Sequence, residues 1–512
     1  MGAGPTGLTA ALLLARYGVR TLVLERAAEP LALPRAVHLD DEGFRILQTL
    51  GLGAQFAAIS RPASGMRLVD ASGRVLAEFA RDTGEGTFGH PQSNLFDQPD
   101  LENLLRDKAS ASSDIELRPG AEVVALEHTA GPGVVVTYRE GDGTTAQQAA
   151  SAVLGCDGAN STVRRLIGPR LLDLHFEQRW LVLDALCVQP LDVWGGVEQV
   201  CDPRRAATFM QVGRERYRWE FRLLAGETAA QLTQPGILAQ LILPWTKTLE
   251  PQGFQVIRAA EYTFAARLAD RWRRGGVFLL GDAAHQMPPF IGQGLGAGLR
   301  DADNLAWKLA WVLQAGADAA LLDTYELERA PHARAVIRSA ILAGWAMTGG
   351  AGRAAALRRI GLAALCRLPG GARLLARTST PRLAAGPLVR RTHRRHDPVG
   401  RPCPQPWVVE GGHRLRLDDV LGAGFAIISA GPADAGLVEL ARGFGQVVSV
   451  DVSGRPAPGV RSVDCPQLRA WLQRSKLSGV LVRPDREVLA AAPVRRQRRG
   501  QPVTTTVTTY RD

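Results

Sequence analysis

Apolar runs and stretches with helical spacing alternate through residues 1–170. The Ala- and Leu-rich stretches recur with a period near 3.6 residues, and the shorter runs are rich in Val, Leu and Ile. Because predicted strands and helices alternate, we expect the first part of an α/β domain here. The predicted helices are Leu8–Tyr17 and Leu101–Lys108, and the predicted strands are Thr21–Leu24, Val123–Leu126 and Val134–Tyr138.

Residues 171–265 follow a different pattern, in which apolar and charged positions alternate singly. In Tyr217–Arg222 every second residue is aromatic, and the residues between them are Arg or Glu. Such alternation is typical of a strand in an antiparallel sheet with one buried and one solvated face. We therefore expect an inserted antiparallel-sheet domain over residues 171–265 and a return to the first domain over 266–395.

The C-terminal part of the chain predicts a separate unit. Ala330–Val389 is rich in Ala, Leu and Arg and predicts mostly helix, and the prolines within Arg390–Pro406 predict a linker. A further domain is then expected over residues 396–512. Its predicted βαβ arrangement is built from strands Phe425–Ser429, Val447–Val452 and Gly479–Val482 and from helices Ala433–Phe444 and Pro466–Gln473.

Composition narrows the class of protein. A chain of 512 residues has room for two or three domains. No run of about 18 apolar residues predicts a membrane span, and no secretion signal is expected. The net charge is +11. Aromatic residues are not interleaved with the basic ones, and no nucleic-acid-binding motif is present, so we expect no nucleic-acid partner. Six scattered cysteines without a CxxC spacing indicate a cytoplasmic protein without a metal site.

Three glycine-containing segments carry the candidate chemistry. In the first, Gly2, Gly4 and Gly7 have the spacing of a dinucleotide-binding fingerprint. Glu25 follows about 20 residues later at the end of the next strand, where an acid accepts hydrogen bonds from a ribose. The predicted helix and strand between them strengthen this interpretation.

The second segment, Val153–Arg165, ends an apolar run at Asp157 and Gly158. A strand-end turn with Asn160 or Ser161 as helix cap needs the same residue types. The functional and the structural interpretation both stay open at this segment.

The third segment, Val277–Ala310, combines an apolar strand, a turn, two prolines, a glycine-rich run and a helix. A strand–loop–helix unit of this kind presents backbone N–H groups and a helix N-terminus to a flat or anionic ligand. Taken alone, the run also fits a simple tight turn. The acid, prolines and glycines of its turn and loop are Gly281, Asp282, Pro288, Pro289, Gly292, Gly294, Gly296 and Gly298.

The order of these segments resembles that of the single-component FAD-dependent aromatic hydroxylases of the para-hydroxybenzoate hydroxylase type. The resemblance runs over nearly the whole chain. It implies a Rossmann-like FAD-binding domain with an inserted antiparallel substrate sheet and a thioredoxin-like C-terminal domain, for which packing or dimerisation is the expected role. Four further segments narrow it to a branch that acts on 3-hydroxyphenyl-alkanoates: Pro34–Glu42, Cys201–Arg204, Gly226–Thr228 and Asp323–Arg329.

The resemblance implies an NAD(P)H-using, FAD-dependent monooxygenase. Side chains cannot activate O2, so the cofactor supplies that chemistry. The implied substrates are O2 and a small aromatic acid, 3-(3-hydroxyphenyl)propionate or 3-hydroxycinnamate, hydroxylated ortho to its hydroxyl group; a homodimer is compatible with this family. Two alternatives remain: the same chemistry on a polyketide or antibiotic-like aromatic, and a flavin-binding protein without productive hydroxylation.

The resemblance also assigns cofactor contacts residue by residue. Asp282 is expected on the ribityl chain, Asp157 as the acid of a motif shared by FAD and NAD(P)H, and Arg35 and Gln98 on the phosphate and flavin sides. With Gly2, Gly4, Gly7 and Glu25, the remaining expected contacts are Gly158, Pro289, Gly292, Gly294, Leu295 and Gly296.

Residues on the substrate side are harder to choose. A base near the phenol makes the ring more nucleophilic. Asp40 is the first candidate and His38 the second, each with a purely structural role as the alternative, while Pro289 helps to shape the place of oxygen delivery. An arginine is expected on the acid group, and the candidates are Arg204, Arg218 and Arg222.

Two departures from the family pattern matter. Relatives commonly carry Asn or Cys where Gly296 stands, so one flavin contact is expected either to be lost or to come from backbone alone. The family's first β-strand should precede Gly2, where only Met1 is present. A missing central strand would leave backbone groups unpaired, and we therefore expect this start to be internal to the natural gene.

Overall fold

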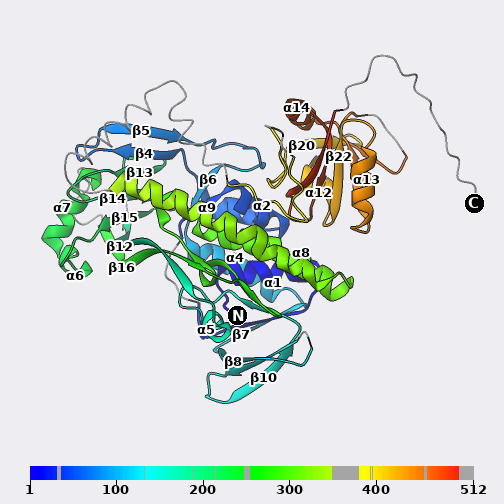
Figure 1. Ribbon diagram of the computed structural model, residues 1–512. Helices are drawn as coiled ribbons and strands as arrows, with labels where there is room; N and C mark the ends of the chain where they lie inside the picture. Colours follow the sequence, from blue (N-terminus) through cyan, green and yellow to red (C-terminus); the bar gives the residue numbers. More distant parts are fainter. Residues whose placement is uncertain are drawn as a thin grey trace, which may run out of the picture. The chain divides into compact units, whose positions relative to one another are not determined.

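The computed structural model describes residues 1–30, 36–131, 133–187, 189–213, 215–246, 254–348, 380–392, 394, 396–454 and 458–494. The chain forms two compact units, Met1–Leu388 and Val389–Asp512, which are described separately. Figure 1 shows the elements of both units in sequence colours.

Two small sheets and the helix α1 (Pro5–Arg16) form the base of the first unit. Strand β1 (Thr21–Glu25) pairs in parallel with β7 (Ile115–Pro119), and β11 (Val153–Gly155) pairs in parallel with β18 (Val277–Leu279). The predicted first helix and strand are confirmed. The helix α4 (Gln98–Ser110), the hairpin β8–β9 (Glu122–His128 and Val134–Arg139) and its neighbour β10 (Thr145–Ala150) confirm the others.

Met1 and Gly2 lie between the two small sheets. The Gly2 N–H donates to the Leu24 carbonyl at 2.8 Å, and the Met1 ammonium group donates to the Leu154 carbonyl at 2.8 Å. The Cys156 N–H donates to the Met1 carbonyl at the same distance. These bonds join the ends of β1 and β11 through the first residues of the chain.

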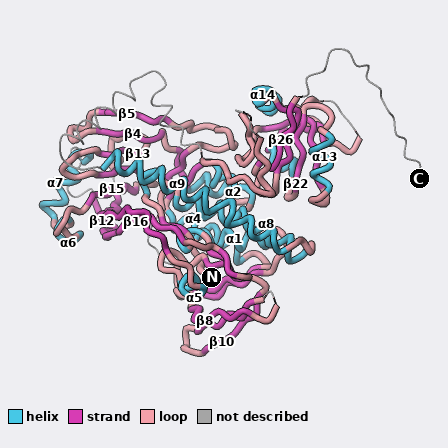
Figure 2. The backbone as a smooth tube through the Cα atoms, in the orientation of Figure 1, coloured by secondary structure: helices cyan, strands magenta, loops and turns pink. Residues whose placement is uncertain are grey.

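An eight-stranded sheet occupies the other part of the first unit. Its strand order is β19-β16-β12-β15-β14-β13-β4-β5, and the long antiparallel pair β12 (Leu171–Cys187) and β16 (Phe254–Ala269) runs through it (Figure 2). The predicted antiparallel strands within residues 171–265 are confirmed, but the sheet extends beyond these bounds, because β4, β5 and β19 also belong to it, and β13 pairs with β4 in parallel. The shorter strands are β4 (Gly65–Val69), β5 (Val75–Ala80), β13 (Val197–Val200), β14 (Ala207–Gln211), β15 (Arg216–Arg222) and β19 (His285–Gln286).

The prediction of a solvated charged face on this sheet is wrong for β15. Its aromatic side chains pack with helix α7 (Pro235–Thr246) on one face, as expected. On the other face, however, Arg218 and Glu220 are buried as well. Alternating apolar and charged residues indicate that the two faces of a strand differ in polarity. The pattern does not indicate whether the charged face is exposed to solvent.

The remaining elements of the first unit connect these parts. The long helices α8 (Gly294–Gln314) and α9 (Asp323–Thr348) contribute to its main core with α1. Beyond α9, residues 349–379 of the predicted helical region lie outside the described residues. The shorter elements are β2 (His38–Asp40), α2 (Asp41–Thr49), α3 (Gly53–Ile59), β3 (Ser60–Pro62), β6 (Ser93–Phe96), α5 (Thr162–Ile167), α6 (Ala229–Leu232), β17 (Arg273–Arg274), η2 (Gly281–Ala283), η3 (Pro289–Ile291) and η4 (Ala319–Leu322).

The second unit contains a five-stranded sheet of order β24-β23-β22-β25-β26. The predicted βαβ arrangement is confirmed, because β22 and β23 are parallel and α13 connects them. The linker prediction for Arg390–Pro406 is wrong: Val399 and Cys403 are buried, and backbone bonds join the segment to β26. The elements are β20 (Trp407–Glu410), β21 (His413–Arg416), α12 (Leu417–Leu421), β22 (Phe425–Ser429), α13 (Ala435–Arg442), β23 (Val447–Asp451), β24 (Arg461–Ser462), α14 (Pro466–Ser475), β25 (Leu477–Val482) and β26 (Val488–Pro493).

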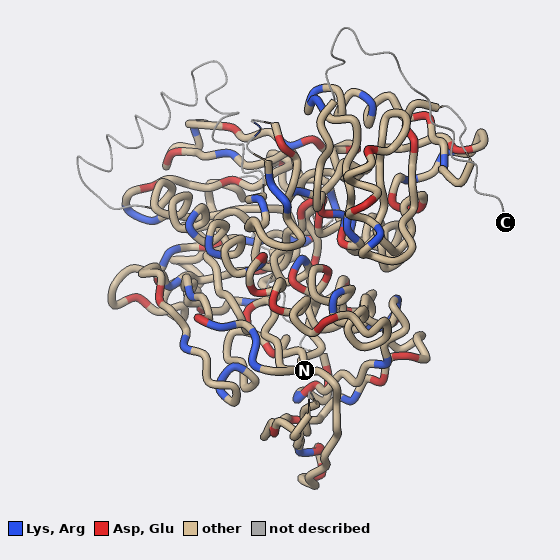
Figure 3. The backbone as a smooth tube through the Cα atoms, turned by 45° about the vertical axis from the view of Figure 1, so that its right-hand side comes forward, with Lys and Arg blue, Asp and Glu red and all other residues tan. Residues whose placement is uncertain are grey.

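Basic and acidic residues are interspersed along the chain in both units (Figure 3). Across the described segments, no helix combines the length and the apolarity needed to cross a membrane.

Candidate functional site

The fingerprint glycines serve two different purposes. At Gly2, which has φ +90°, an added Cβ would lie 2.5 Å from the Cys156 carbonyl oxygen, and at Gly7 it would lie 2.0 Å from the Gly2 carbonyl oxygen. These two positions therefore need glycine for close packing. A Cβ at Gly4 would meet nothing within 4 Å, so Gly4 leaves open space at the start of α1, as the approach of a pyrophosphate requires.

The helices α1 and α8 both begin without a side-chain cap among the described residues, and neither has an acid in its first turn. In contrast, Asp40 caps α2 by accepting from the Gly43 N–H, and Ser161 caps α5 by accepting from the Arg164 N–H. Uncapped N–H groups and the positive end of the helix dipole favour an anion at the start of α1 and of α8.

Thr6 brings the first and third segments together. A Cβ added at Gly298 would lie 2.3 Å from the Thr6 Oγ1, and one added at Gly281 would lie 3.0 Å from it. The start of α1 therefore touches both the η2 turn and the first turns of α8. We call this assembly, the starts of α1 and α8 together with η2 and the segment between η2 and α8, the cofactor wall.

Glu25 supports the fingerprint loop directly. Its carboxylate accepts hydrogen bonds from the Ala3 N–H at 2.7 Å and from the Ala27 N–H at 2.9 Å. Each oxygen keeps a further lone pair, so the predicted ribose contact is compatible with this loop-holding role.

Asp157 performs the structural role that its sequence left open. Its carboxylate accepts from the Ser161 hydroxyl at 2.6 Å and from the N–H groups of Thr162 and Val163 at 2.7 and 3.0 Å. Gly158 follows with φ +77°, a conformation that favours glycine. Asp157 thus fixes the turn between β11 and α5.

The third segment folds as its pattern predicts. The strand β18 runs through Leu280 into the η2 turn, where Asp282 is exposed, and η3 leaves Pro289 exposed. Gly292 ends η3 with φ +62°. Gly294, Leu295 and Gly296 then form the first turn of α8.

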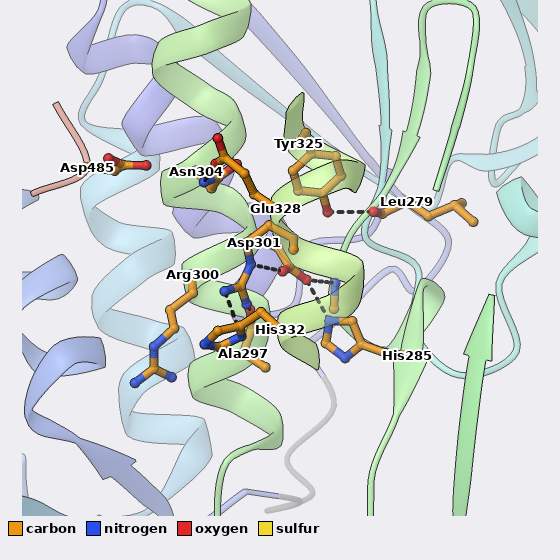
Figure 4. A network of polar contacts seen from close by, with 12 residues as sticks. Leu279, His285, Ala297, Arg300, Asp301, Asn304, Tyr325, Glu328, His332 and Asp485 are labelled. Carbon is orange, nitrogen blue, oxygen red and sulfur yellow. Dashed lines mark hydrogen bonds and ion pairs between the residues drawn. The ribbon is translucent and has the colours of Figure 1, made fainter. Parts of the chain in front are cut away.

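A buried network of ion pairs and hydrogen bonds around Asp301 stabilises this segment (Figure 4). The Asp301 carboxylate accepts from the Gly281 N–H at 3.0 Å, pairs with the His285 Nε2 at 2.7 Å and accepts from the Arg329 Nε at 2.8 Å. Although burial favours its neutral form, His285 and Arg329 lower the pKa of Asp301. Asp301 remains ionised and fixes the turn that carries Asp282.

His38 is also held against the third segment. Its Nδ1 lies 2.9 Å from the Gly292 carbonyl oxygen, and its Nε2 lies 2.9 Å from the Ser93 Oγ. Burial lowers the pKa of His38. Near it, the Gln98 Oε1 accepts from the Ala36 N–H. The predicted contact Arg35 lies outside the described residues.

Asp40 takes part in a second buried network. The Arg300 guanidinium donates to Asp40 and to Glu42, and its charge and hydrogen bond lower the pKa of Asp40 against the effect of burial. Asp41, between these acids, has its pKa raised to about 8 by burial and by their charges. A Cβ at Gly296 would lie 2.8 Å from the Arg300 Nη1. In this chain, Arg300 therefore occupies the space next to residue 296.

The three predicted acid-binding arginines lie in different surroundings. Arg204 is exposed and pairs with Asp202 at 3.0 Å. Arg218 is 2% exposed and pairs with Asp184, which is fully buried. Arg222 is half-buried and donates to the Thr348 carbonyl at 2.9 Å.

The sheet reaches the cofactor wall through an aromatic cluster. Trp180 of β12 lies edge-on to Phe290 of η3, with ring centroids 5.9 Å apart, and Phe176 makes a similar contact with Phe290 at 5.7 Å. Trp180 stands opposite Arg222 in the register of β12 and β15. The face of the sheet that carries these residues, which we call the inner face, therefore borders the third segment.

Sequence reasoning missed Arg300, Asp301, Asp184 and Glu220. One signal was available, because Asp184 is a lone acid within the apolar run Leu181–Cys187 and such an acid needs a buried partner. Among the described residues, no group of three or more His, Cys, Asp or Glu is arranged to hold a metal ion.

The family described as FAD binding domain matches residues 1–340, and the HcaD C-terminal domain family matches residues 400–504. A 3-(3-hydroxy-phenyl)propionate/3-hydroxycinnamic acid hydroxylase of Burkholderia cenocepacia is 35% identical, covering 96% of this chain and 92% of the relative. The Escherichia coli O81 protein of the same name is 34% identical over 96% of this chain and 91% of its own length.

Two solved structures have similar folds. The anhydrotetracycline hydroxylase OxyS from Streptomyces rimosus matches with a TM-score of 0.73 and 28% identity, over 96% of this chain and 94% of that one. A complex of aklavinone-11 hydroxylase with FAD and aklavinone matches with a TM-score of 0.76 and 24% identity over the same shares.

Proposed function

The chain belongs to the FAD-binding family of aromatic-ring monooxygenases, and from this premise we propose that it hydroxylates 3-(3-hydroxyphenyl)propionate or 3-hydroxycinnamate ortho to the existing hydroxyl group. The observation that carries the proposal is the contact of Phe290 and Trp180, which joins the cofactor wall to the inner face of the sheet. An aromatic ring bound at this contact would lie beside the segment Pro289–Gln293, which we call the flavin loop.

The cofactor wall fits FAD. The open space at Gly4 and the uncapped start of α1 suit the pyrophosphate, Glu25 suits the ribose, and the exposed Asp282 suits the ribityl chain. The start of α8, from Gly294 to Gly296, would offer its N–H groups to the flavin ring. Reduced by NAD(P)H, the bound FAD supplies the activation of O2, which no side chain can supply.

On the substrate side, Arg222 is the best of the three arginines for the acid group. The structure gives its guanidinium a carbonyl partner at Thr348 but, among the described residues, no carboxylate partner. Arg204 and Arg218 already pair with Asp202 and Asp184. A half-buried arginine without a counter-charge favours an anionic ligand.

His38 and Asp40 are better suited to positioning than to proton transfer. Both ring nitrogens of His38 have partners, and one of them is the Gly292 carbonyl of the flavin loop. Asp40 is committed to Arg300 and to the Gly43 N–H. We infer that the two residues fix the loop that shapes the place of oxygen delivery, together with Pro289.

The test is turnover by the purified, FAD-loaded protein. We expect 3-(3-hydroxyphenyl)propionate to accelerate NAD(P)H oxidation and to yield the 2,3-dihydroxy product by mass spectrometry. The variant Arg222→Met should weaken binding of this acid but not of 3-ethylphenol, which lacks the carboxylate, and Arg204→Met should change neither. Absence of the diol with both phenolic acids would refute the proposal.

A second candidate substrate is a polycyclic polyketide-type aromatic, because OxyS, named an anhydrotetracycline hydroxylase, is 28% identical over 96% of this chain. Anhydrotetracycline in the same assay distinguishes the two. NAD(P)H oxidation that yields only H2O2 with every ligand would instead indicate a flavoprotein without productive hydroxylation.

A further inference from the structure

Strand β15 presents four charged side chains on the inner face of the sheet. Tyr217, Trp219 and Phe221 belong to the apolar cluster against α7 on the opposite face. Since side chains alternate along a strand, the intervening charged residues all point to the inner face. They are Arg216, Arg218, Glu220 and Arg222.

Three of these four side chains have partners. Arg216 pairs with Asp97, which directly precedes α4. Arg218 donates to both carboxylate oxygens of Asp184, at 2.8 and 3.0 Å, and Arg222 donates to the Thr348 carbonyl. Each arginine therefore has a hydrogen-bonded role in the fold.

Glu220 is the exception. Glu220 is 8% exposed, and no hydrogen bond from a described residue to its carboxyl group is found. Burial raises the pKa of Glu220 to about 7, with Arg218 opposing the rise and Asp184 adding to it. Carboxyl groups with pKa values raised by burial are found preferentially at functional sites, and the Glu220 carboxyl group keeps its acceptor sites for a ligand.

The register places Glu220 between two contacts with the flavin-binding part. Thr208 of β14 and Val182 of β12 stand opposite it. On one side, the next row of inner-face residues includes Met210, which packs against Val37 beside His38. On the other side, the next row includes Trp180, which packs against Phe290. Glu220 thus points toward the region bounded by the flavin loop and the segment that carries His38.

We propose that Glu220 accepts the hydrogen bond of the substrate's phenolic hydroxyl group and takes its proton. The phenolic O–H bond breaks, its electron pair stays on the phenol oxygen, and an O–H bond forms on the Glu220 carboxylate. The resulting phenolate makes the ortho carbon more nucleophilic, and the proton returns to that oxygen in the product. The inference rests on the proposed function, in which Arg222, two positions along β15, holds the acid group.

The experiment compares Glu220→Gln with the wild-type protein, both loaded with oxidised FAD and without NAD(P)H, so that no turnover occurs. The ligands are 3-(3-hydroxyphenyl)propionate and 3-phenylpropionate, which differ only in the phenolic hydroxyl. We expect the substitution to raise the Kd of the hydroxylated ligand about tenfold, because a neutral acceptor replaces a charged one, and to leave the Kd of 3-phenylpropionate unchanged.

A turnover readout separates proton transfer from binding alone. With NAD(P)H present and 3-(3-hydroxyphenyl)propionate saturating, Glu220→Gln should lower the rate of diol formation about a hundredfold, and the loss should shrink as the pH approaches the pKa of the phenol, about 10, because the phenol then ionises without a base. Glu198→Gln is the matched control, since Glu198 lies in β13 of the same sheet but bonds to Trp245 on the opposite face. Unchanged binding of 3-phenylpropionate and full FAD content show that each variant is folded.

The outcomes distinguish the two proposals. A Glu220→Gln protein that keeps both the affinity for the phenol and the rate of diol formation overturns the role of Glu220. A wild-type protein that retains FAD but binds neither phenylpropionate refutes the proposed substrate instead. The same comparison then uses anhydrotetracycline and a deoxy analogue, and an unchanged preference for the hydroxyl in Glu220→Gln would again overturn the inference.

Discussion

The cofactor wall and the inner face of the sheet use buried charge in opposite ways. In the cofactor wall, backbone groups and the exposed Asp282 form the proposed ligand side, and the buried ion pairs support it: Asp301 accepts from the Gly281 N–H, and Arg300 fills the space beside Gly296. On the inner face, the charged side chains themselves point outward from the sheet, as Arg222 and Glu220 do.

The difference follows from what each surface must do. A nucleotide phosphate carries a permanent charge, and fixed N–H dipoles bind it without any change of protonation, provided that the backbone is rigid. A phenol must lose a proton, so the facing group has to titrate. Backbone cannot titrate near neutral pH, but a buried carboxyl group such as Glu220 can.

Removing Asp301 should damage the cofactor wall most. In Asp301→Asn, the amide would face the donors of Arg329, His285 and Gly281 without a charge to match Arg329. We expect the free energy of unfolding to fall by about 3–5 kcal/mol and the FAD content to fall with it. Urea denaturation and the flavin absorbance per protein measure the two effects.

Asp323→Asn is the matched control for that variant. Asp323 also pairs with an arginine, Arg273, but its side chain is 73% exposed, so the expected change is below about 1 kcal/mol. Normal stability and FAD content in Asp301→Asn would contradict the view that buried charge supports this wall.

Breaking the pair of Asp184 and Arg218 tests the sheet separately. Asp184→Asn leaves Arg218 buried without a counter-charge, and we expect a loss of about 3 kcal/mol in unfolding free energy. The FAD content should stay near normal, because no contact between this pair and the cofactor wall is found among the described residues. Glu78→Gln, which breaks an exposed pair with Arg67 in the same sheet, should have little effect. A parallel loss of FAD would show that the two surfaces are not independent.

The same difference explains which parts could be predicted from the sequence. Backbone sites depend on glycine spacing, helix starts and turns, which are local, so the segments around Gly2–Gly7 and Val277–Ala310 were predicted with their strands and helices. Asp301 meets Arg329 and Asp184 meets Arg218 only after folding, over 28 and 34 residues of chain. Nothing local in Arg216–Arg222 distinguishes a buried charged face from a solvated one, and the prediction there was wrong.

Gly298→Ala tests whether the first and third segments are joined by the close packing of the Gly298 backbone against Thr6. The new Cβ would lie 2.3 Å from the Thr6 Oγ1, and overpacking between α1 and α8 should cost about 2 kcal/mol. Thr6→Ala removes that oxygen and leaves the nearest remaining contacts at 3.4 Å and beyond, so the double variant should recover most of the loss.

Gly4→Ala provides the contrast to that pair. Its Cβ would meet no atom within 4 Å, so the stability of the FAD-free protein should not change, but the affinity for FAD should fall. A double variant Thr6→Ala/Gly298→Ala as unstable as Gly298→Ala alone would contradict the packing argument. Unchanged FAD affinity in Gly4→Ala would contradict the assignment of the open space to the pyrophosphate.

The most gradual expected effect is a pH dependence of stability that comes from Glu220. Its pKa is raised from 4.5 to about 7 in the folded protein, so between these values the folded state holds a proton that the unfolded state has released. The stabilising contribution is complete below pH 4.5 and is lost as the pH rises through 7. Glu220→Gln lacks this titration, whereas Asp41, whose pKa is also raised, titrates in both proteins.

The difference in unfolding free energy between wild type and Glu220→Gln should therefore fall by about 1 kcal/mol per pH unit between pH 5 and 7. Urea denaturation at half-unit steps of pH measures it, with Glu198→Gln as the control that should run parallel to wild type. Parallel curves for Glu220→Gln as well would mean that Glu220 titrates like an exposed acid. The inner face would then present a fixed charge, and its contrast with the cofactor wall would rest on geometry rather than on proton transfer.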